Sequence, residues 1–212
     1  MEQKEPQPEL PPTVCISRKI GIGALEIADI LAEKIGSRVI DREILEHIAG
    51  QAKLSQKTVA LFDEQYPGEI GELLSLAFRE KAFIKSDYTR HLFSTILSVA
   101  GLGPAIFVGR GVHMLLPRDR VLAVRFIASK EHRIKQLARI LDIEREMAER
   151  KLEQIDREQK DFFKKVYGKR DASPYEFDLV INCDYITDPQ WASEIVALTF
   201  RTKFCAETRP SD

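Results

Sequence analysis

The stretch Thr13–Ile27 reads TVCISRKIGIGALEI, and the fold of the remaining chain depends on it. An apolar run at 14–16 leads through three polar residues into Gly21-Ile22-Gly23, and a helical apolar pattern follows from about 24 to 35. A strand, a glycine turn and a helix in this order direct backbone N–H groups and a positive helix terminus toward a bound phosphate. The stretch therefore suggests a phosphate site, and a tight strand-to-helix turn without a ligand is the alternative.

This turn departs from the full phosphate-binding loop, G-x-x-x-x-G-K-[ST], whose lysine reaches the phosphates and whose hydroxyl holds magnesium. Ala24 and Leu25 follow Gly23, so the lysine and the hydroxyl are both missing. The nearest cations, Arg18 and Lys19, precede the turn. Any affinity for phosphate would come from backbone amides and these two side chains.

The composition is that of an ordinary globular protein. The chain has 212 residues, of which 44% are hydrophobic and 31% charged, and its formal net charge is −1. Such a balance gives no general attraction to nucleic acid or to a membrane surface. The three cysteines form no C-x-x-C pair and have no metal-ligand spacing with the four histidines. We expect a reduced cytoplasmic protein without a protein-held metal, and the sequence indicates no oligomeric state.

The order of predicted elements indicates an α/β fold. Residues 1–12 contain four prolines and are expected to be a disordered lead-in, as is the tail at 205–212. Strands are predicted near 13–17, 38–40, 105–108, 121–127 and 178–182, with helices between them. Apolar clusters at 73–78 and 92–100 are interpreted as core faces of helices. Strands that alternate with helices predict a parallel sheet with right-handed crossovers.

Two charged residues directly follow predicted strands. Asp41 is either the N-cap of the next helix or a group that faces the ligand crevice at the carboxyl edge of the sheet. Arg110 stands between Gly109 and Gly111, where it is either a solvated loop residue or a bidentate phosphate ligand. We favour the phosphate ligand, because an arginine flanked by two glycines at a strand end is uncommon.

With these elements in place, residues from about Val14 to Phe200 resemble the cytidylate kinase-like family of P-loop nucleoside monophosphate kinases. The resemblance is carried by ISRKIGIGALEIADILAEKIG, VIDREIL, AIFVGRGVHMLL, HRI, IDREQKDFF and YEFDLVIN. It implies a three-layer P-loop NTPase fold with a five-stranded parallel sheet in the order 2-3-1-4-5. It also implies a single domain at 13–204, with a helical monophosphate-binding region at about 42–101 and a helical lid at about 142–172.

The resemblance implies transfer of phosphate from ATP to a pyrimidine nucleoside monophosphate, first of all CMP or dCMP, with Mg²⁺ between the phosphates. The lid would supply the catalytic cations Arg133, Arg157 and Lys160, and the monophosphate would lie at Asp41 and Arg110. The loop that would bind the ATP phosphates comprises Ser17, Arg18, Lys19, Gly21, Ile22, Gly23, Ala24 and Leu25.

Three departures from the family pattern concern the charge of the site. The loop has Ile22 and Ala24 where the family has a serine and a second glycine. Gln159 stands where the family has a lid arginine, and Gln136 stands where its members often have an arginine in the preceding helix. Each lost arginine removes positive charge from a transition state with several negative oxygens. Arg157 and Lys160 are the cations nearest the missing lid arginine, so we expect one of them to face the nucleotide.

These departures leave two alternatives to an active kinase. One is a nucleotide-binding regulatory protein on the same fold, with weakened catalysis. The other is a purely structural α/β protein, for which the glycine turn and the glycine-flanked arginine would be coincidences.

Overall fold

A computed structural model describes residues 10–51, 87–169 and 171–205. The predicted apolar cluster at 73–78 lies outside these residues. The five strands are β1 (Thr13–Arg18), β2 (Arg38–Ile40), β3 (Ala105–Val108), β4 (Val121–Ile127) and β5 (Leu179–Asn182). They form one parallel sheet in the order β2-β3-β1-β4-β5, which confirms the predicted fold class, strand positions and strand order.

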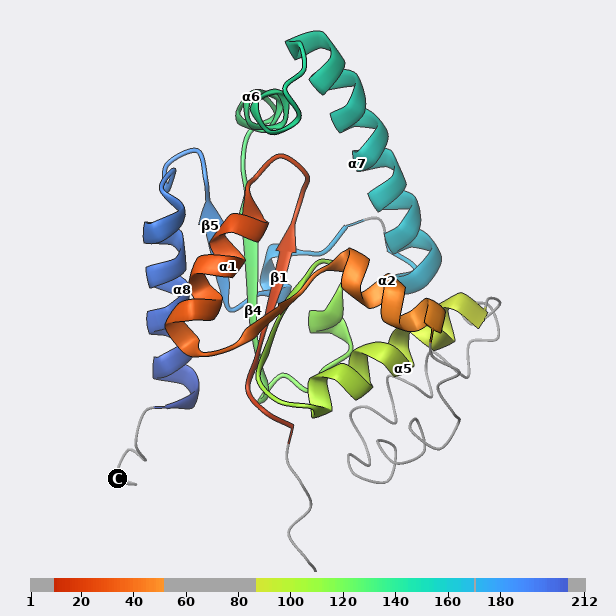
Figure 1. Cartoon of the computed structure of the whole chain (residues 1–212), viewed down its shortest axis with the longest axis vertical. Helices are drawn as coiled ribbons and strands as arrows, with labels where there is room; N and C mark the ends of the chain where they lie inside the picture. The colour runs from red at the N-terminus through yellow and green to blue at the C-terminus, as the bar shows by residue number, and fades with distance from the viewer. Residues whose placement is uncertain (1–9, 52–86, 170, 206–212) are drawn as a thin grey trace, which may run out of the picture.

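Helices cover both faces of this sheet (Figure 1). One face packs against α1 (Ala24–Ile35) and α8 (Pro189–Phe204), and the other against α2 (Arg42–Gln51), α5 (Asp87–Gly101) and η1 (Val112–Met114). Successive residues of a strand point to opposite faces. Accordingly Val14 and Ile16 join the α1/α8 cluster, while Cys15 joins the α2/α5 cluster.

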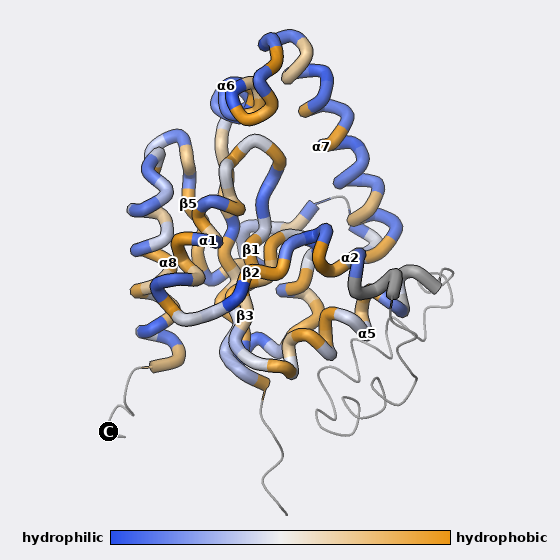
Figure 2. Tube along the Cα trace, viewed as in Figure 1, coloured by the Kyte–Doolittle hydropathy of each residue, from blue (hydrophilic) through white to orange (hydrophobic). Residues whose placement is uncertain are grey.

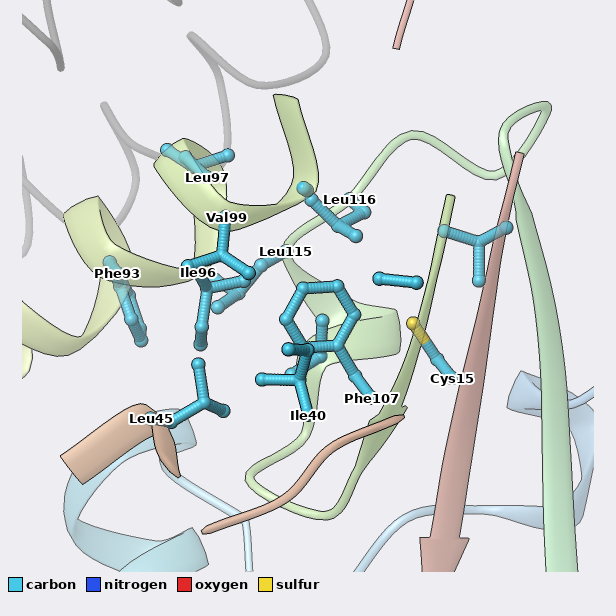
Figure 3. Packing of buried hydrophobic residues seen from close by; sticks show 14 of the residues in the cluster. Cys15, Ile40, Leu45, Phe93, Ile96, Leu97, Val99, Phe107, Leu115 and Leu116 are labelled. Atoms are coloured by element: carbon cyan, nitrogen blue, oxygen red, sulfur yellow. The ribbon is translucent and has the colours of Figure 1, made fainter. Parts of the chain in front are cut away.

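The α2/α5 cluster holds Phe107 at its centre (Figure 3). Phe107, Ile96 and Leu45 are fully buried, and Cys15 lies among them. Burial raises the pKa of the Cys15 thiol well above its usual range, because the thiolate would lose its hydration. Cys15 is therefore a small apolar residue of the core, as its place in an apolar run suggested.

A helical hairpin stands beyond the carboxyl edge of the sheet (Figure 1). It consists of α6 (Lys130–Leu141) and α7 (Arg145–Tyr167), and Ser129 caps the start of α6 through a hydrogen bond from the backbone N–H of His132. Ile134, Leu137, Ala148 and Leu152 form its own apolar core. Hydrophilic residues cover most of its remaining surface (Figure 2). The resemblance implied a lid at about 142–172. From here on, we use the word lid for the whole hairpin, residues 130–167.

The N-terminal lead-in at 1–12 differs in part from the disorder that the sequence predicted. Leu10 lies within the predicted disordered lead-in, yet it is buried in the α2/α5 cluster, and the backbone N–H of Thr13 donates to the carbonyl of Arg120. The lead-in therefore joins the fold before residue 13, because an apolar side chain there reaches the core. Within the described ranges, no helix combines the length and apolar character that crossing a bilayer requires.

Candidate functional site

Three neighbouring strands bring an arginine to the same edge of the sheet. Ile16 of β1 pairs with Val108 of β3, so Arg18 and Arg110 each lie two residues beyond that pair. Ile40 at the end of β2 pairs with Phe107, and Arg42 follows two residues later. In open α/β sheets, the carboxyl edge is where ligands bind.

These arginines line a hollow of about 320 Å³, which we call the Arg110 hollow. The first helical turn of α2 and one face of α7 complete it. Its charged and aromatic lining residues are Arg18, Arg42, Arg110, Glu158, Phe162, Phe163 and Lys165. Among the described lining residues, four cations thus stand against one carboxylate, so the Arg110 hollow is suited to an anion.

The backbone at Arg110 adopts a conformation that a non-glycine residue seldom takes. Gly109, Arg110 and Gly111 have φ values of 91°, 56° and 69°. The phenol of Tyr167 donates to the Arg110 carbonyl oxygen at 2.5 Å, and a Cβ at Gly111 would lie 2.7 Å from the Tyr167 ring. A left-handed non-glycine residue costs roughly 1–2 kcal/mol, and such residues cluster at functional sites.

Aromatic packing orients the Arg110 side chain. Its guanidinium carbon lies 4.1 Å from the centre of the Phe162 ring of α7. A cation over the face of an aromatic ring is attracted by the ring's quadrupole, so Phe162 helps to hold the Arg110 side chain in place. Sequence reasoning did not select Phe162 for the site, although it lies in the stretch IDREQKDFF that carries part of the family resemblance.

Electrostatics at Arg18 also favour an anion. Burial lowers the pKa of the Arg18 guanidinium, and the nearby positive charges of Arg42 and Arg110 lower it further, against the opposing carboxylate of Asp41. An anion in the Arg110 hollow would relieve this repulsion.

The glycine turn lies between the Arg110 hollow and a second hollow. Gly21 and Gly23 have φ values of 81° and 76°. A Cβ at Gly21 would stand 2.5 Å from the carbonyl oxygen of Arg133, so this glycine is required by the close approach of α6. Gly23 precedes the first residue of α1 in the N-cap position.

The second hollow, the Gly23 hollow, has a volume of about 410 Å³. Its walls come from the glycine turn, the start of α1, one side of α6 and the loop after β5. The lining residues include Ile22, Gly23, Glu26, His132, Gln136, Arg139, Ile186 and Thr187. It lies beside the helix N-terminus to which the sequence assigned the ATP phosphates.

Two side chains of the lid bind the backbone just before the glycine turn, at Arg18 and Ile20. Arg133, with 4% of its surface exposed, donates to both carboxylate oxygens of Asp156 at 3.0 and 2.6 Å, and to the carbonyl oxygen of Ile20 at 2.8 Å. Gln159 donates its amide N–H to the carbonyl oxygen of Arg18 at 3.0 Å. Arg133 is thus engaged in joining α6, α7 and the turn.

The structure does not bring Arg157 and Lys160 to the Arg110 hollow. They line a third hollow of about 420 Å³, together with Lys130, Arg133, Leu152, Glu153 and Asp156. Successive helical residues are rotated by about 100°, so the face that carries Gln159 and Phe162 turns these two cations away. The expectation that one of them faces the nucleotide stays a prediction.

The remaining predicted residues have local roles. The Asp41 carboxylate accepts from the N–H of Ile44 at 2.8 Å, as an N-cap does. Lys19 Nζ lies 3.8 Å from Asp171 Oδ2, and Ser17 pairs with Arg125 across the sheet. In the loop to which the sequence assigned the ATP phosphates, Ile22 and Ala24 are buried and Leu25 is exposed.

Sequence reasoning missed Arg42 and Lys165. Arg42 could have been found by its position, because it lies two residues past a strand end as Arg110 does. Lys165 stands among many charged residues of α7, and nothing in its sequence context separates it from its neighbours.

A parallel sheet in this order, with a glycine turn after its central strand and a helical lid above, defines the fold of P-loop kinases. The chain matches the cytidylate kinase-like family over residues 13–185, and it belongs to that family. No curated protein matches it.

Several solved structures are similar to the chain at low sequence identity. An uncharacterized protein from Eubacterium ventriosum has a TM-score of 0.69 at 16% identity, over 90% of this chain and 98% of that chain. An APS kinase from Mycobacterium tuberculosis, solved with AMPPNP and APS, has a TM-score of 0.49 at 14% identity, over 92% and 99%. A shikimate kinase from Bacteroides thetaiotaomicron has a TM-score of 0.45 at 13% identity, over 90% and 96%.

Proposed function

We propose that the protein transfers the γ-phosphoryl group of ATP to the phosphate of a pyrimidine nucleoside monophosphate, first of all CMP or dCMP. The observation that carries this proposal is Arg110, held in a left-handed conformation at the carboxyl edge of the sheet within a cationic hollow. Membership of the cytidylate kinase-like family supports the reaction class.

In this reaction an oxygen of the acceptor phosphate attacks the γ-phosphorus of ATP. A new P–O bond forms to the acceptor, the bond between the γ-phosphorus and the β-phosphate oxygen breaks, and ADP leaves with that electron pair. The protein contributes positioning and positive charge. Arg110 would hold the acceptor phosphate as a bidentate fork, and the N-terminus of α1 at Gly23 would face the ATP phosphates.

The presence of two separate hollows supports one binding site for each of the two substrates. The Arg110 hollow would hold the acceptor, and the Gly23 hollow would hold the ribose and base of ATP. Because the glycine turn lies between them, the γ-phosphate would meet the acceptor phosphate beside that turn.

Mg²⁺ would neutralise part of the negative charge of the ATP phosphates. The described residues contain no cluster of three or more His, Cys, Asp or Glu side chains that could hold a metal ion. Leu25 also stands where a complete loop would supply a hydroxyl. These residues do not fit a dedicated metal site, and we propose that Mg²⁺ enters as part of the Mg-ATP substrate.

The lid contacts favour a second candidate, a nucleotide-binding regulatory protein with weakened catalysis. Arg133 is occupied by Asp156, and Gln159 places an uncharged amide on the glycine turn where the family has an arginine. Such a protein would bind ATP and signal through the position of the lid.

A coupled ADP-release assay with Mg-ATP and CMP, dCMP, UMP or AMP separates these candidates. The kinase proposal predicts ADP release that depends on the acceptor and is fastest with CMP or dCMP. ATP binding in isothermal titration without acceptor-stimulated release would favour the regulatory candidate. A protein that binds neither ATP nor any of these monophosphates would contradict both.

A further inference from the structure

We propose that the outward face of α8 binds the same face of α8 in a second copy of this chain, and that the two helices run antiparallel. The inference is independent of the proposed function, because it rests on the side chains along one helix. Within the described part of the chain, α8 packs on α1 and on the sheet, and it lies at one edge of the molecule (Figure 1).

Both the inner and the outer face of α8 carry apolar side chains. On the inner face, Ala192, Val196 and Phe200 are buried in the α1/α8 cluster. A surface helix usually carries polar residues on its opposite face. α8 instead carries Trp191 and Leu198 there, with exposed fractions of 61% and 63%. They are seven residues apart, about two helical turns, so they lie along one line of the helix.

The outer residues follow the spacing of a coiled-coil seam. Trp191, Ile195, Leu198 and Thr202 succeed one another at intervals of four, three and four residues, and we call them the α8 seam. This alternation places the a and d residues of a heptad on one stripe that faces a partner helix. Ile195 is half-buried and the other three are exposed. Single exposed apolar residues are common on protein surfaces, whereas a continuous apolar stripe marks an interaction surface.

The charges beside the α8 seam indicate the partner and its direction. Glu194 and Arg201 are seven residues apart and occupy the same g position of the heptad, on one flank of the seam. In an antiparallel pair related by a two-fold axis, Glu194 of each copy faces Arg201 of the other. In a parallel pair, the residue opposite Glu194 would be Thr199 of the second copy, which carries no charge. The surface is thus complementary to itself in the antiparallel direction.

The register that forms these two ion pairs also matches the seam residues. It places Ile195 opposite Leu198 and Trp191 opposite Thr202, and symmetry repeats each contact. The seam spans about three helical turns, so we expect an interface at the small end of specific ones and a Kd in the micromolar range.

The ion pair that Glu194 already forms within the chain is compatible with this arrangement. Glu194 pairs with Lys34 of α1, and its side chain is still 57% exposed, so the carboxylate can accept a second cation. Exposed ion pairs contribute little to affinity, but complementary charges fix the orientation of two partners. We therefore assign most of the affinity to the seam and the antiparallel direction to Glu194 and Arg201.

The first test is sedimentation equilibrium of the full chain over a range of concentrations. The variants are Leu198→Glu and the milder Leu198→Ser. The matched control is Leu102→Glu, because Leu102 is 73% exposed and lies directly after α5, away from α8. Thermal melting verifies that each variant folds, and Leu198→Ser carries the test if Leu198→Glu does not fold.

The proposal predicts a reversible monomer–dimer equilibrium for the wild type. Leu198→Glu should raise the dimer Kd by roughly tenfold or more, since a charge replaces an apolar residue near the centre of the interface. Leu102→Glu should leave the Kd within about twofold of the wild type. A wild type that is monomeric at every concentration, or equal effects of the two variants, would overturn the interface.

Trp191 reports on the same surface, because it is the single tryptophan of the chain. Its fluorescence emission should shift to longer wavelengths on dilution, as the dimer dissociates and water reaches the indole. The midpoint of this shift should match the Kd from sedimentation. Dimerisation without any change in Trp191 emission would place the interface elsewhere and overturn the proposal.

Charge reversal tests the antiparallel direction. Glu194→Arg and Arg201→Glu should each raise the dimer Kd by about three- to tenfold, because each places like charges opposite one another twice in the dimer. The double variant Glu194→Arg/Arg201→Glu restores both pairs with reversed signs, so its Kd should return to near that of the wild type. A double variant as weak as the single ones would overturn the antiparallel register.

Discussion

The ion pair between Arg133 and Asp156 leads to a quantitative prediction about the lid. Both residues belong to the lid, and the Arg133 guanidinium also holds the glycine turn through the Ile20 carbonyl. The Arg133 side chain is 5% exposed and that of Asp156 is 20% exposed. Asp156→Asn keeps the shape of the side chain but leaves the buried guanidinium without its counter-charge.

The expected loss in the free energy of unfolding follows from the burial of the ion pair between Arg133 and Asp156. Removing one partner of a fully buried pair costs about 3–5 kcal/mol. Since Asp156 is one-fifth exposed, and asparagine still offers one acceptor oxygen, we expect a loss of about 2–3 kcal/mol. For a domain of this size that corresponds to a fall in Tm of roughly 4–12 °C.

The assay is urea and thermal unfolding, followed by circular dichroism. Glu131→Gln is the matched control, because Glu131 pairs with Arg145 and also joins α6 to α7, but on the exposed side of the lid. Exposed pairs contribute little, so its unfolding midpoint should match that of the wild type. Equal midpoints for Asp156→Asn and Glu131→Gln would refute the structural role of Arg133 in holding the lid.

Three further predictions concern other positions. The pKa of His113 is lowered to about 4 by burial, against the opposing charge of Glu176, so the unfolded chain binds a proton below pH 6.5 that the folded protein does not. The free energy of unfolding should therefore fall from pH 6.5 to 4 by at most about 3 kcal/mol, and His113→Gln should flatten that slope in urea unfolding. Gly21→Ala should lower the free energy of unfolding more than Gly36→Ala in the same measurement. Both positions have positive φ, but only a Cβ at Gly21 would lie against α6. Equal losses of unfolding free energy would show that the turn adapts to the added Cβ. Arg110→Lys should weaken CMP binding by about 1.5–3 kcal/mol in isothermal titration and leave ATP binding nearly unchanged, whereas a similar loss for ATP would place Arg110 outside the acceptor site.

The centre of the sheet could be predicted from the sequence because most residues of β1, β3 and β4 are buried, whichever face they point to. Apolar runs such as Ala105–Val108 have no polar alternation, and glycine or polar residues mark their ends. The family resemblance then supplied the strand order. Leu10 was not anticipated, since the surrounding prolines and charges are typical of a disordered segment.

The candidate site was predictable only where a residue follows a strand end. Arg110 was found this way, and its glycine neighbours explain its backbone conformation. The direction in which Arg18 points could not be read, because a residue at the end of β1 can face either side of the glycine turn. The face of α7 that lines the site could not be predicted, because charged residues lie on several faces of this helix. In the structure, Phe162 packs against Arg110 and marks that face.

The measurement that tests the account most directly is transfer of label from ATP carrying ³²P in its γ-phosphate. Incubated with CMP and the wild-type protein, the label should appear in CDP. The Arg110→Ala variant should lose this transfer while its titration with ATP stays like that of the wild type. Label that appears only as inorganic phosphate, or CDP formed equally well by the variant, would contradict the assignment of the Arg110 hollow to the phosphate acceptor.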